Sequence, residues 1–491
     1  MTKFNDIFVE AKRLIELALP IILSLSLSCS MSVIDTVMTG QVSAQDLAAV
    51  SIGAAGWNLL FLTMTAVIMA LTPQLAKLFG ERNYSAILDW VCGGRWFALL
   101  VTSVFYAASV VTLYAISRLD TAPGTIDLAS NYLLFILLGL PAAALLQVHK
   151  SLSESSGNTK HILLVTGIGV LLNIPLNYLF IHGLSLDNQT VLIPAMGGAG
   201  CGMASGIIFW LTLIGLIQIQ KKDKQLTHKI FNTDDSNDCK HRNNFSWTVP
   251  KEFKTIASQL AKVGIPIGLA IFAEVSVFTY IPLVIAHLGK IQVASHQIAL
   301  NVSSMMFMIP LGMSQAITVR TGYHLGRGSP QMAQMVSRTG IAIAFLFGIA
   351  SMSLIMLNSN SIPKLYTDNE EVLLLASSLL ILAAIFQLSD TVQVTAAGAL
   401  RGYQLTTIPM ILTLVSFWVI AIPVGYILGL ESDVRSYLET IIYLPDPMGA
   451  KGFWIALISG LSANGLLQTA YLFYIQTRRH TATHQDSFSP L

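Results

Sequence analysis

The sequence is poor in charged residues. Only 11% of its 491 residues are Asp, Glu, Lys or Arg, whereas soluble domains contain roughly 25%. Hydrophobic residues make up 54% of the chain. So few charged side chains could not cover the surface of a soluble protein of this length, and the composition excludes that class. The net charge of +2 gives no reason to expect a nucleic-acid partner.

Motifs for ATP use and for metal binding are also missing. The sequence has no GxxxxGK(S/T) segment to hold phosphates, no HExxH and no grouped Cys and His residues. Its four cysteines are scattered without a CxxC pair, which favours a structural role: Cys29, Cys92, Cys201 and Cys239. We therefore expect neither an enzyme nor a resident cofactor. Transport driven by ATP would require a separate subunit, whereas a carrier driven by an ion gradient needs only ion sites within the membrane.

What the sequence does contain is long hydrophobic runs. Twelve apolar stretches can each supply the roughly 20 residues that cross a hydrocarbon core. They lie near residues 14–38, 47–72, 97–117, 128–149, 161–182, 194–219, 257–286, 293–319, 338–358, 371–398, 406–430 and 451–476. The sequence thus predicts an all-α polytopic membrane protein with twelve transmembrane helices.

Residues 20–80 and 266–326 look like two copies of one unit. Each copy begins with a Pro near the start of an apolar run and ends on a Gly, and the offset between copies is 246 residues at both ends. Six helices per half make the halves parallel repeats, related by an axis along the membrane normal. We expect six-helix bundles at 1–220 and 255–478, a cytoplasmic linker at 221–254 and a disordered polar tail at 479–491.

The positions of Lys and Arg predict the orientation in the membrane. With the N-terminus inside, the outer loops hold five of the 28 basic residues, Arg118, Lys290, Lys364, Arg435 and Lys451, and the other 23 lie inside. Such enrichment sets topology, so we expect both termini in the cytoplasm. Other ionisable residues near predicted helix ends are explained by the interface, among them Arg95, His149, Arg320 and Arg401.

Three acids fall inside predicted helices: Asp35, Glu274 and Asp390. A charged carboxylate at the bilayer centre costs roughly 2.5–3.5 kcal/mol on insertion scales, which favours a functional role. Glu274 and Asp390 are expected near the midplane of the second half, where they can share one cation. Asn173 and Asn177, one helical turn apart, offer hard oxygen ligands beside Asp35. We interpret these residues as cation sites, with structural hydrogen bonding as the alternative.

These residues stand in segments that carry a family resemblance. The chain resembles the multidrug and toxic compound extrusion family, in particular its NorM-like branch, over nearly its whole length. The matching segments are residues 33–38, 173–177, 272–275, 295–301 and 390–402. The resemblance implies an antiporter of the bacterial inner membrane that exports amphipathic, often cationic drugs in exchange for inward Na+ or H+. It also implies two bundles around a central cleft that alternate between outward-open and inward-open states.

The resemblance assigns roles to the intramembrane residues. It implies that Glu274 and Asp390 form a cation site in the second half, which holds Na+ if the protein is sodium-coupled. It implies a second site at Asp35, Asn173 and Asn177. Phe386, one turn before Asp390, stands where some relatives carry Tyr, so a hydroxyl ligand is absent there. We expect a monomer in the lipid bilayer.

Aromatic faces and thioethers suit apolar cations, and the chain has many of both. Our candidates for contact with the drug are Trp57, Phe61, Phe272, Gln297, Met305 and Phe307. Packing against lipid or neighbouring helices is the alternative for each of them.

Three other functions are alternatives to drug export. A flippase for a lipid-linked saccharide is the closest, but such proteins tend to hold diphosphate with basic residues, and here the deep ionisable residues are acidic. An integral membrane enzyme would need clustered His, Asp or Ser near one interface. A signalling protein would need a larger domain outside the membrane. The sequence thus favours a cation-coupled drug exporter, with the flippase as alternative, and leaves the ion and the drugs open.

Overall fold

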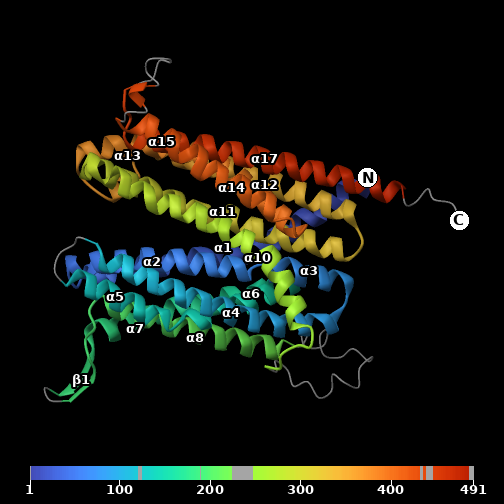
Figure 1. The fold of residues 1–491 in the computed structure, drawn as a ribbon, viewed down its shortest axis with the longest axis horizontal. Helices are drawn as coiled ribbons and strands as arrows, with labels where there is room; N and C mark the ends of the chain where they lie inside the picture. Colours follow the sequence, from blue (N-terminus) through green and yellow to red (C-terminus); the bar gives the residue numbers. More distant parts are fainter. Residues whose placement is uncertain are drawn as a thin grey trace. The chain divides into compact units, whose positions relative to one another are not determined.

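The computed structural model describes residues 2–119, 124–187, 190–223, 247–431, 435–437 and 446–485. In the first half the elements are α1 (Thr2–Gly40), α2 (Ala44–Ile68), α3 (Leu71–Glu81), α4 (Tyr84–Ser117), α5 (Thr125–Leu137), α6 (Leu140–Ser156), α7 (Thr159–His182), β1 (Leu184–Asp187), β2 (Thr190–Ile193) and α8 (Ala199–Lys222). In the second half they are α10 (Phe253–Ile285), η2 (Ala286–Leu288), α11 (Lys290–Gly326), α12 (Pro330–Leu357), η3 (Pro363–Leu365), α13 (Glu370–Gly402), α14 (Thr407–Leu414), η4 (Val415–Ala421), α15 (Ile422–Gly429) and α17 (Ala450–Gln485). Figure 1 shows these elements coloured along the chain.

The helices are long enough to cross a membrane repeatedly. Eleven helical stretches of the described residues pass by length and composition, and the bent pair α5 and α6, at 44°, brings the number to twelve. One of the eleven runs through α14, the π-helix η4 and α15, from Thr407 to Gly429. The predicted all-α fold with twelve transmembrane helices is confirmed, and the chain is a multi-pass membrane protein.

The residues form two compact units whose limits do not follow the two halves of the sequence. One unit is Leu19–Gly268, and the other combines Met1–Ala18 with Leu269–Leu491. The start of α1 therefore belongs with the second half, and the first part of α10 belongs with the first. Most of the expected linker, residues 224–246, lies outside the described residues.

Two details differ from the sequence prediction. α17 continues to Gln485, so residues 479–485 of the tail that we expected to be disordered are helical. β1 and β2 form an antiparallel pair between α7 and α8, with Leu184 opposite Ile193. A short connection that reverses direction can close with backbone hydrogen bonds between its two arms, and the hydrophobic pattern of the flanking helices gave no signal for this.

Glycines set the closest helix contacts inside each unit. A Cβ atom on Gly264 of α10 would lie 2.2 Å from the carbonyl oxygen of Val67, and one on Gly268 would lie 2.4 Å from a methyl of the same valine. Two glycines four residues apart thus let α10 cross α2 closely, which ties the first part of α10 to the first unit. In the second unit, a Cβ on Gly398 of α13 would lie 2.3 Å from Ser314 Oγ of α11.

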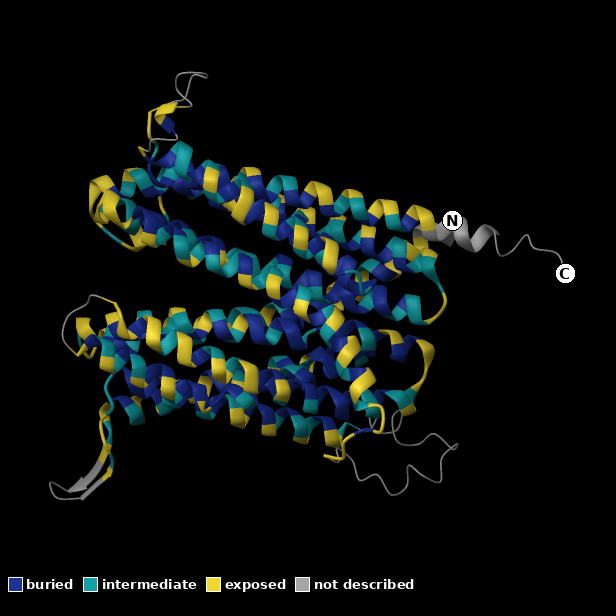
Figure 2. Cartoon of the chain, in the orientation of Figure 1, coloured by how far each residue is buried: buried dark blue, intermediate teal, exposed yellow. Residues whose placement is uncertain are grey.

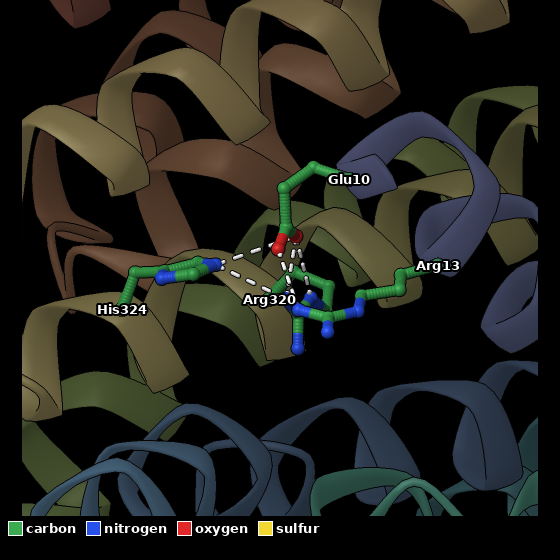
Figure 3. A network of polar contacts seen from close by, with 4 residues as sticks. All are labelled: Glu10, Arg13, Arg320 and His324. Atoms are coloured by element: carbon green, nitrogen blue, oxygen red, sulfur yellow. Dashed lines mark hydrogen bonds and ion pairs between the residues drawn. The ribbon is translucent and has the colours of Figure 1, made fainter. Parts of the chain in front are cut away.

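An ionic cluster binds the start of α1 to α11 within the second unit (Figure 3). Arg320 Nε donates to Glu10 Oε2 at 3.1 Å, and Arg13 Nη1 donates to Glu10 Oε1 at 3.0 Å. His324 Nε2 lies 3.3 Å from Glu10 Oε2. The side chain of Glu10 is only 3% exposed and that of Arg320 15%, so the carboxylate at the centre of this cluster is buried. The interfacial position that we expected for Arg320 stays a prediction.

Buried and exposed residues lie on different faces of the helices, and the exposed faces carry many apolar side chains, as expected for helices in a bilayer. Figure 2 shows buried residues along the inward faces of the helices within each unit and exposed residues on the outward faces. Many exposed side chains are large and apolar, including Val111, Leu171 and Leu374. Such a surface is unfavourable in water, and it fits contact with lipid chains.

Candidate cation sites

In the first unit, three polar residues meet around Asp35. Asn173 Nδ2 donates to Asp35 Oδ1 at 3.0 Å, and Asn177 Nδ2 donates to the same oxygen at 2.6 Å. Ser205 Oγ donates to Asp35 Oδ2 at 3.2 Å. The carboxyl group comes from α1, the amides from α7 and the hydroxyl from α8. The structure thus brings together the three residues that the sequence predicted as a cation site.

Ser205 was missed by the sequence analysis. It follows the small residues at the start of α8. Small residues usually indicate close contact between helices, so a serine among them is easily taken for a packing residue. One turn earlier, Cys201 Sγ lies 3.9 Å from the carbonyl oxygen of Asp35, and Thr39 donates to that same carbonyl. The sequence did contain a signal for Ser205. Cys201 and Ser205 are four residues apart, so they lie on the same face of α8, and both face Asp35.

One hydrogen-bond acceptor of this site, an amide oxygen, has no partner. Asn177 and Asn173 are both fully buried, and Asn177 Oδ1 has no hydrogen-bond partner. A buried amide oxygen without a partner is costly, and it suits a site that accepts a cation or a proton-bearing group. Asp35 is thus a single carboxylate surrounded by neutral hydrogen-bond donors, with one free amide oxygen, that of Asn177, close by.

In the second unit, Glu274 of α10 and Asp390 of α13 lie close enough to interact electrostatically. Phe278 and Phe386 meet one turn away, edge to face, with ring centroids 5.9 Å apart. Because Phe278 follows Glu274 by one turn and Phe386 precedes Asp390 by one turn, this contact places the two acids opposite each other on antiparallel helices. Trp454 packs against Phe386 at 5.5 Å and extends the apolar layer beside the acids.

The burial of Arg401 differs from the sequence prediction. We expected it near a helix end, where the interface would accommodate it, but it is only 8% exposed. It donates from Nη2 to Ser314 Oγ at 2.6 Å and interacts electrostatically with Glu274. The reason is that α13 continues to Gly402 and packs against α11, which encloses the guanidinium.

The candidates for drug contact differ in exposure. In the first unit, Trp57 is 5% exposed and stacks on Phe61 at 5.3 Å, with Phe209 at 5.8 Å from the indole. Trp57 therefore lies inside an aromatic cluster. The candidates of the second unit are exposed or partly exposed: Phe272, Gln297, Met305 and Phe307. Their predicted role stays a prediction.

Comparison with known families identifies the protein family in which these sites occur. The MatE family model matches residues 20–179 and again residues 266–427. Both matches begin at the prolines, Pro20 and Pro266, that begin the two copies seen in the sequence, and this confirms the internal repeat. The chain belongs to the multidrug and toxic compound extrusion (MATE) family. The predicted family resemblance is therefore correct.

Individual relatives agree with membership of the MATE family. The chain is 39% identical over 476 residues, 96% of either protein, to the probable multidrug resistance protein NorM of Shewanella oneidensis. Its structure resembles that of the eukaryotic MATE transporter AtDTX14 with a TM-score of 0.82 and 17% identity, over 96% of this chain and 98% of the other. A MATE protein in a straight conformation gives a TM-score of 0.78 and 18% identity, over 96% of each chain. At such identities the two structures show a shared fold.

Among the residues that the structure describes, no three His, Cys, Asp or Glu side chains gather as metal ligands. Each unit instead offers one or two carboxylates with neutral oxygens nearby. That set suits a monovalent cation or a proton better than a tightly held divalent metal.

Proposed function

We propose that the protein is a secondary active antiporter. It exports amphipathic, often cationic drugs in exchange for inward Na+ or H+, by alternating access between its two bundles. It acts as a monomer without a resident cofactor and without enzymatic activity.

The acids inside the helices carry this proposal. Asp35 in one unit, and Glu274 with Asp390 in the other, lie on helices long and apolar enough to cross a membrane. Intramembrane carboxylates are expensive, and they typically mark ion or proton pathways. The name of the Shewanella oneidensis relative, a probable multidrug resistance protein, supports drugs as the exported cargo.

Thermodynamics allows such coupling. Export against a hundredfold drug gradient costs about 2.8 kcal/mol, at about 1.4 kcal/mol per factor of ten. One positive charge that enters the cell gains about 2.3 kcal/mol per 100 mV of membrane potential, but a monocationic drug that leaves costs the same amount. A one-for-one exchange is therefore driven by the concentration gradient of the ion alone. A second coupling ion, for which the two separate acid sites have room, would make the exchange electrogenic and add the membrane potential as a driving force.

A lipid-linked saccharide flippase remains the other candidate, and no specific contact favours it. Such a protein would need basic side chains placed to hold a diphosphate. Arg401 is a buried basic residue, but Ser314 and Glu274 already engage it. The acidic sites have no role in holding an anion.

The proposal is tested by reconstitution in liposomes with a fluorescent cationic dye inside or outside. We expect dye movement when an Na+ gradient or a pH gradient is imposed, and none in empty liposomes. Absence of dye movement under both gradients, with protein correctly inserted, would reject the antiporter and leave the flippase to be tested with a labelled lipid-linked saccharide.

We propose the bacterial inner membrane as the location, with both termini in the cytoplasm. The Lys and Arg distribution and the bacterial relative support it. A fluorescent protein fused after the last residue, or inserted in residues 221–254, is expected to fluoresce. Alkaline phosphatase inserted between β1 and β2 is expected to be active, because that connection follows an odd number of crossings. The opposite pattern would reverse the assigned orientation.

A further inference from the structure

Two glutamines flank Asp390 on α13. Gln387 precedes it by three residues and Gln393 follows it by three. In an α-helix this spacing places both side chains on the same side as Asp390, about 60° to its left and right around the axis. The acid of the second unit therefore stands between two amides, one turn before it and one turn after it.

Both glutamines are buried with unused hydrogen-bonding atoms. Gln387 is 0% exposed, and neither its Oε1 nor its Nε2 has a partner. Gln393 is 4% exposed, and its Oε1 has no partner. Burying an amide oxygen without a partner is unfavourable, so two such oxygens beside one acid require an explanation.

Packing elsewhere in the same bundle shows how a purely structural amide is treated. Gln476 of α17 is 3% exposed, yet its Nε2 donates to Ser337 Oγ at 2.9 Å and its Oε1 accepts from Arg338 Nε at 3.0 Å. Not every buried glutamine of the bundle is satisfied in this way, because Gln468 Oε1 of α17 also has no partner. Gln387 differs from both in that neither of its amide atoms has a partner, and Gln387 and Gln393 stand next to Asp390.

Helix contacts close this part of α13 on several sides. Ser314 Oγ of α11 donates to the carbonyl oxygen of Val394 at 2.6 Å, and Ser389 Oγ lies 2.7 Å from Ser462 Oγ of α17. On the side of α10, the contact of Phe278 with Phe386 places Glu274 opposite Asp390. The amide oxygens of Gln387 and Gln393 are thus enclosed in the same section of the bundle as both acids.

We propose that the carboxamide oxygens of Gln387 and Gln393 are ligands of a monovalent alkali cation bound between Glu274 and Asp390. This rests on the proposed cation-coupled transport and names the ion class and two further ligand residues for that site. An alkali cation needs several hard oxygens to replace its water, and the two carboxylates and two amides supply them. A proton needs no such neutral ligands.

The chemistry of the site suits a monovalent cation. The two acids supply negative charge, and the neutral amides add coordination without adding charge.

The test measures binding of radioactive sodium to the purified full-length protein that carries Asp35→Asn, so that only the second unit contributes. Gln387→Met and Gln393→Met keep the side-chain length but remove the amide. We expect each to raise the dissociation constant for Na+ about tenfold, the effect of losing one contact to a charged group. Competition with Li+ is expected to change as well, because ligand number sets the selectivity.

Gln476→Met is the matched control, since it removes a buried amide of the same bundle that has its own partners. It is expected to leave the Na+ dissociation constant within about twofold, and the melting temperature identifies any variant that fails to fold. Unchanged Na+ affinity and Li+ competition in both folded glutamine variants would overturn the inference, as would an equal loss in Gln476→Met. Dye transport by the parent protein is scored separately, so failure of the proposed transport function is distinguished from failure of these ligands.

Discussion

Asp390→Asn is expected to abolish dye transport driven by an Na+ gradient. The substitution keeps the shape of the side chain and removes one of the two carboxylates that face each other across α10 and α13. Removing one member of a buried ionic contact costs about 3–5 kcal/mol, which corresponds to about a hundredfold or greater loss of cation affinity. The measurement is the initial rate of dye movement in liposomes at a fixed Na+ gradient.

Asp35→Asn and Asp46→Asn are the informative comparisons for this experiment. Asp35→Asn is expected to abolish movement driven by a pH gradient, because the first unit offers one carboxylate with neutral donors. Asp46 is also buried, but its Oδ1 accepts from the Gly198 backbone nitrogen at 2.6 Å, which an asparagine oxygen can also do. Asp46→Asn should therefore transport normally. More than half of the parent rate in Asp390→Asn under the Na+ gradient would contradict the assigned site.

Glu10→Ala is expected to lower the free energy of unfolding by about 3–5 kcal/mol, because it removes a buried carboxylate from partly buried Arg320 and from buried His324. The cluster holds the start of α1 to α11 (Figure 3), so the loss also frees residues before Ala18 from the second unit. The measurements are the melting temperature in detergent and hydrogen exchange of the first turns of α1, both of which should report loosening.

The same helix segment provides the control. Lys12 and Glu16 form a pair at 3.8 Å whose side chains are 69% and 63% exposed. Exposed pairs of this kind contribute about 0.3–0.5 kcal/mol, so Glu16→Ala should leave the melting temperature nearly unchanged. Glu10→Ala combined with Arg320→Met should recover part of the loss, since the double change also removes Arg320, the less exposed of the two arginines that lose their carboxylate. A melting temperature for Glu10→Ala equal to that of Glu16→Ala would show that the cluster does not hold α1.

Much of the fold could be predicted from the sequence because hydrophobic runs in a bilayer have few alternatives. A run of about 20 apolar residues must satisfy its backbone internally, and a helix does so. The repeat was visible at Pro20 and Pro266, where the two family matches begin. Acids such as Asp35 were visible because a carboxylate in an apolar run is rare and costly.

The sequence alone determined the class, the twelve helices, the repeat, the family and the two asparagines that meet Asp35. The tertiary structure decided which polar residues are enclosed and with what partners. Ser205, Gln387 and Arg401 look ordinary in the chain, and their burial depends on which helix faces meet. The assignment of α1 to both units likewise depends on Glu10 meeting Arg320, which lies 310 residues away. The local pattern of hydrophobic residues is enough to predict a helix. Contacts between distant segments depend on how the helices pack, and no single stretch of sequence determines that packing.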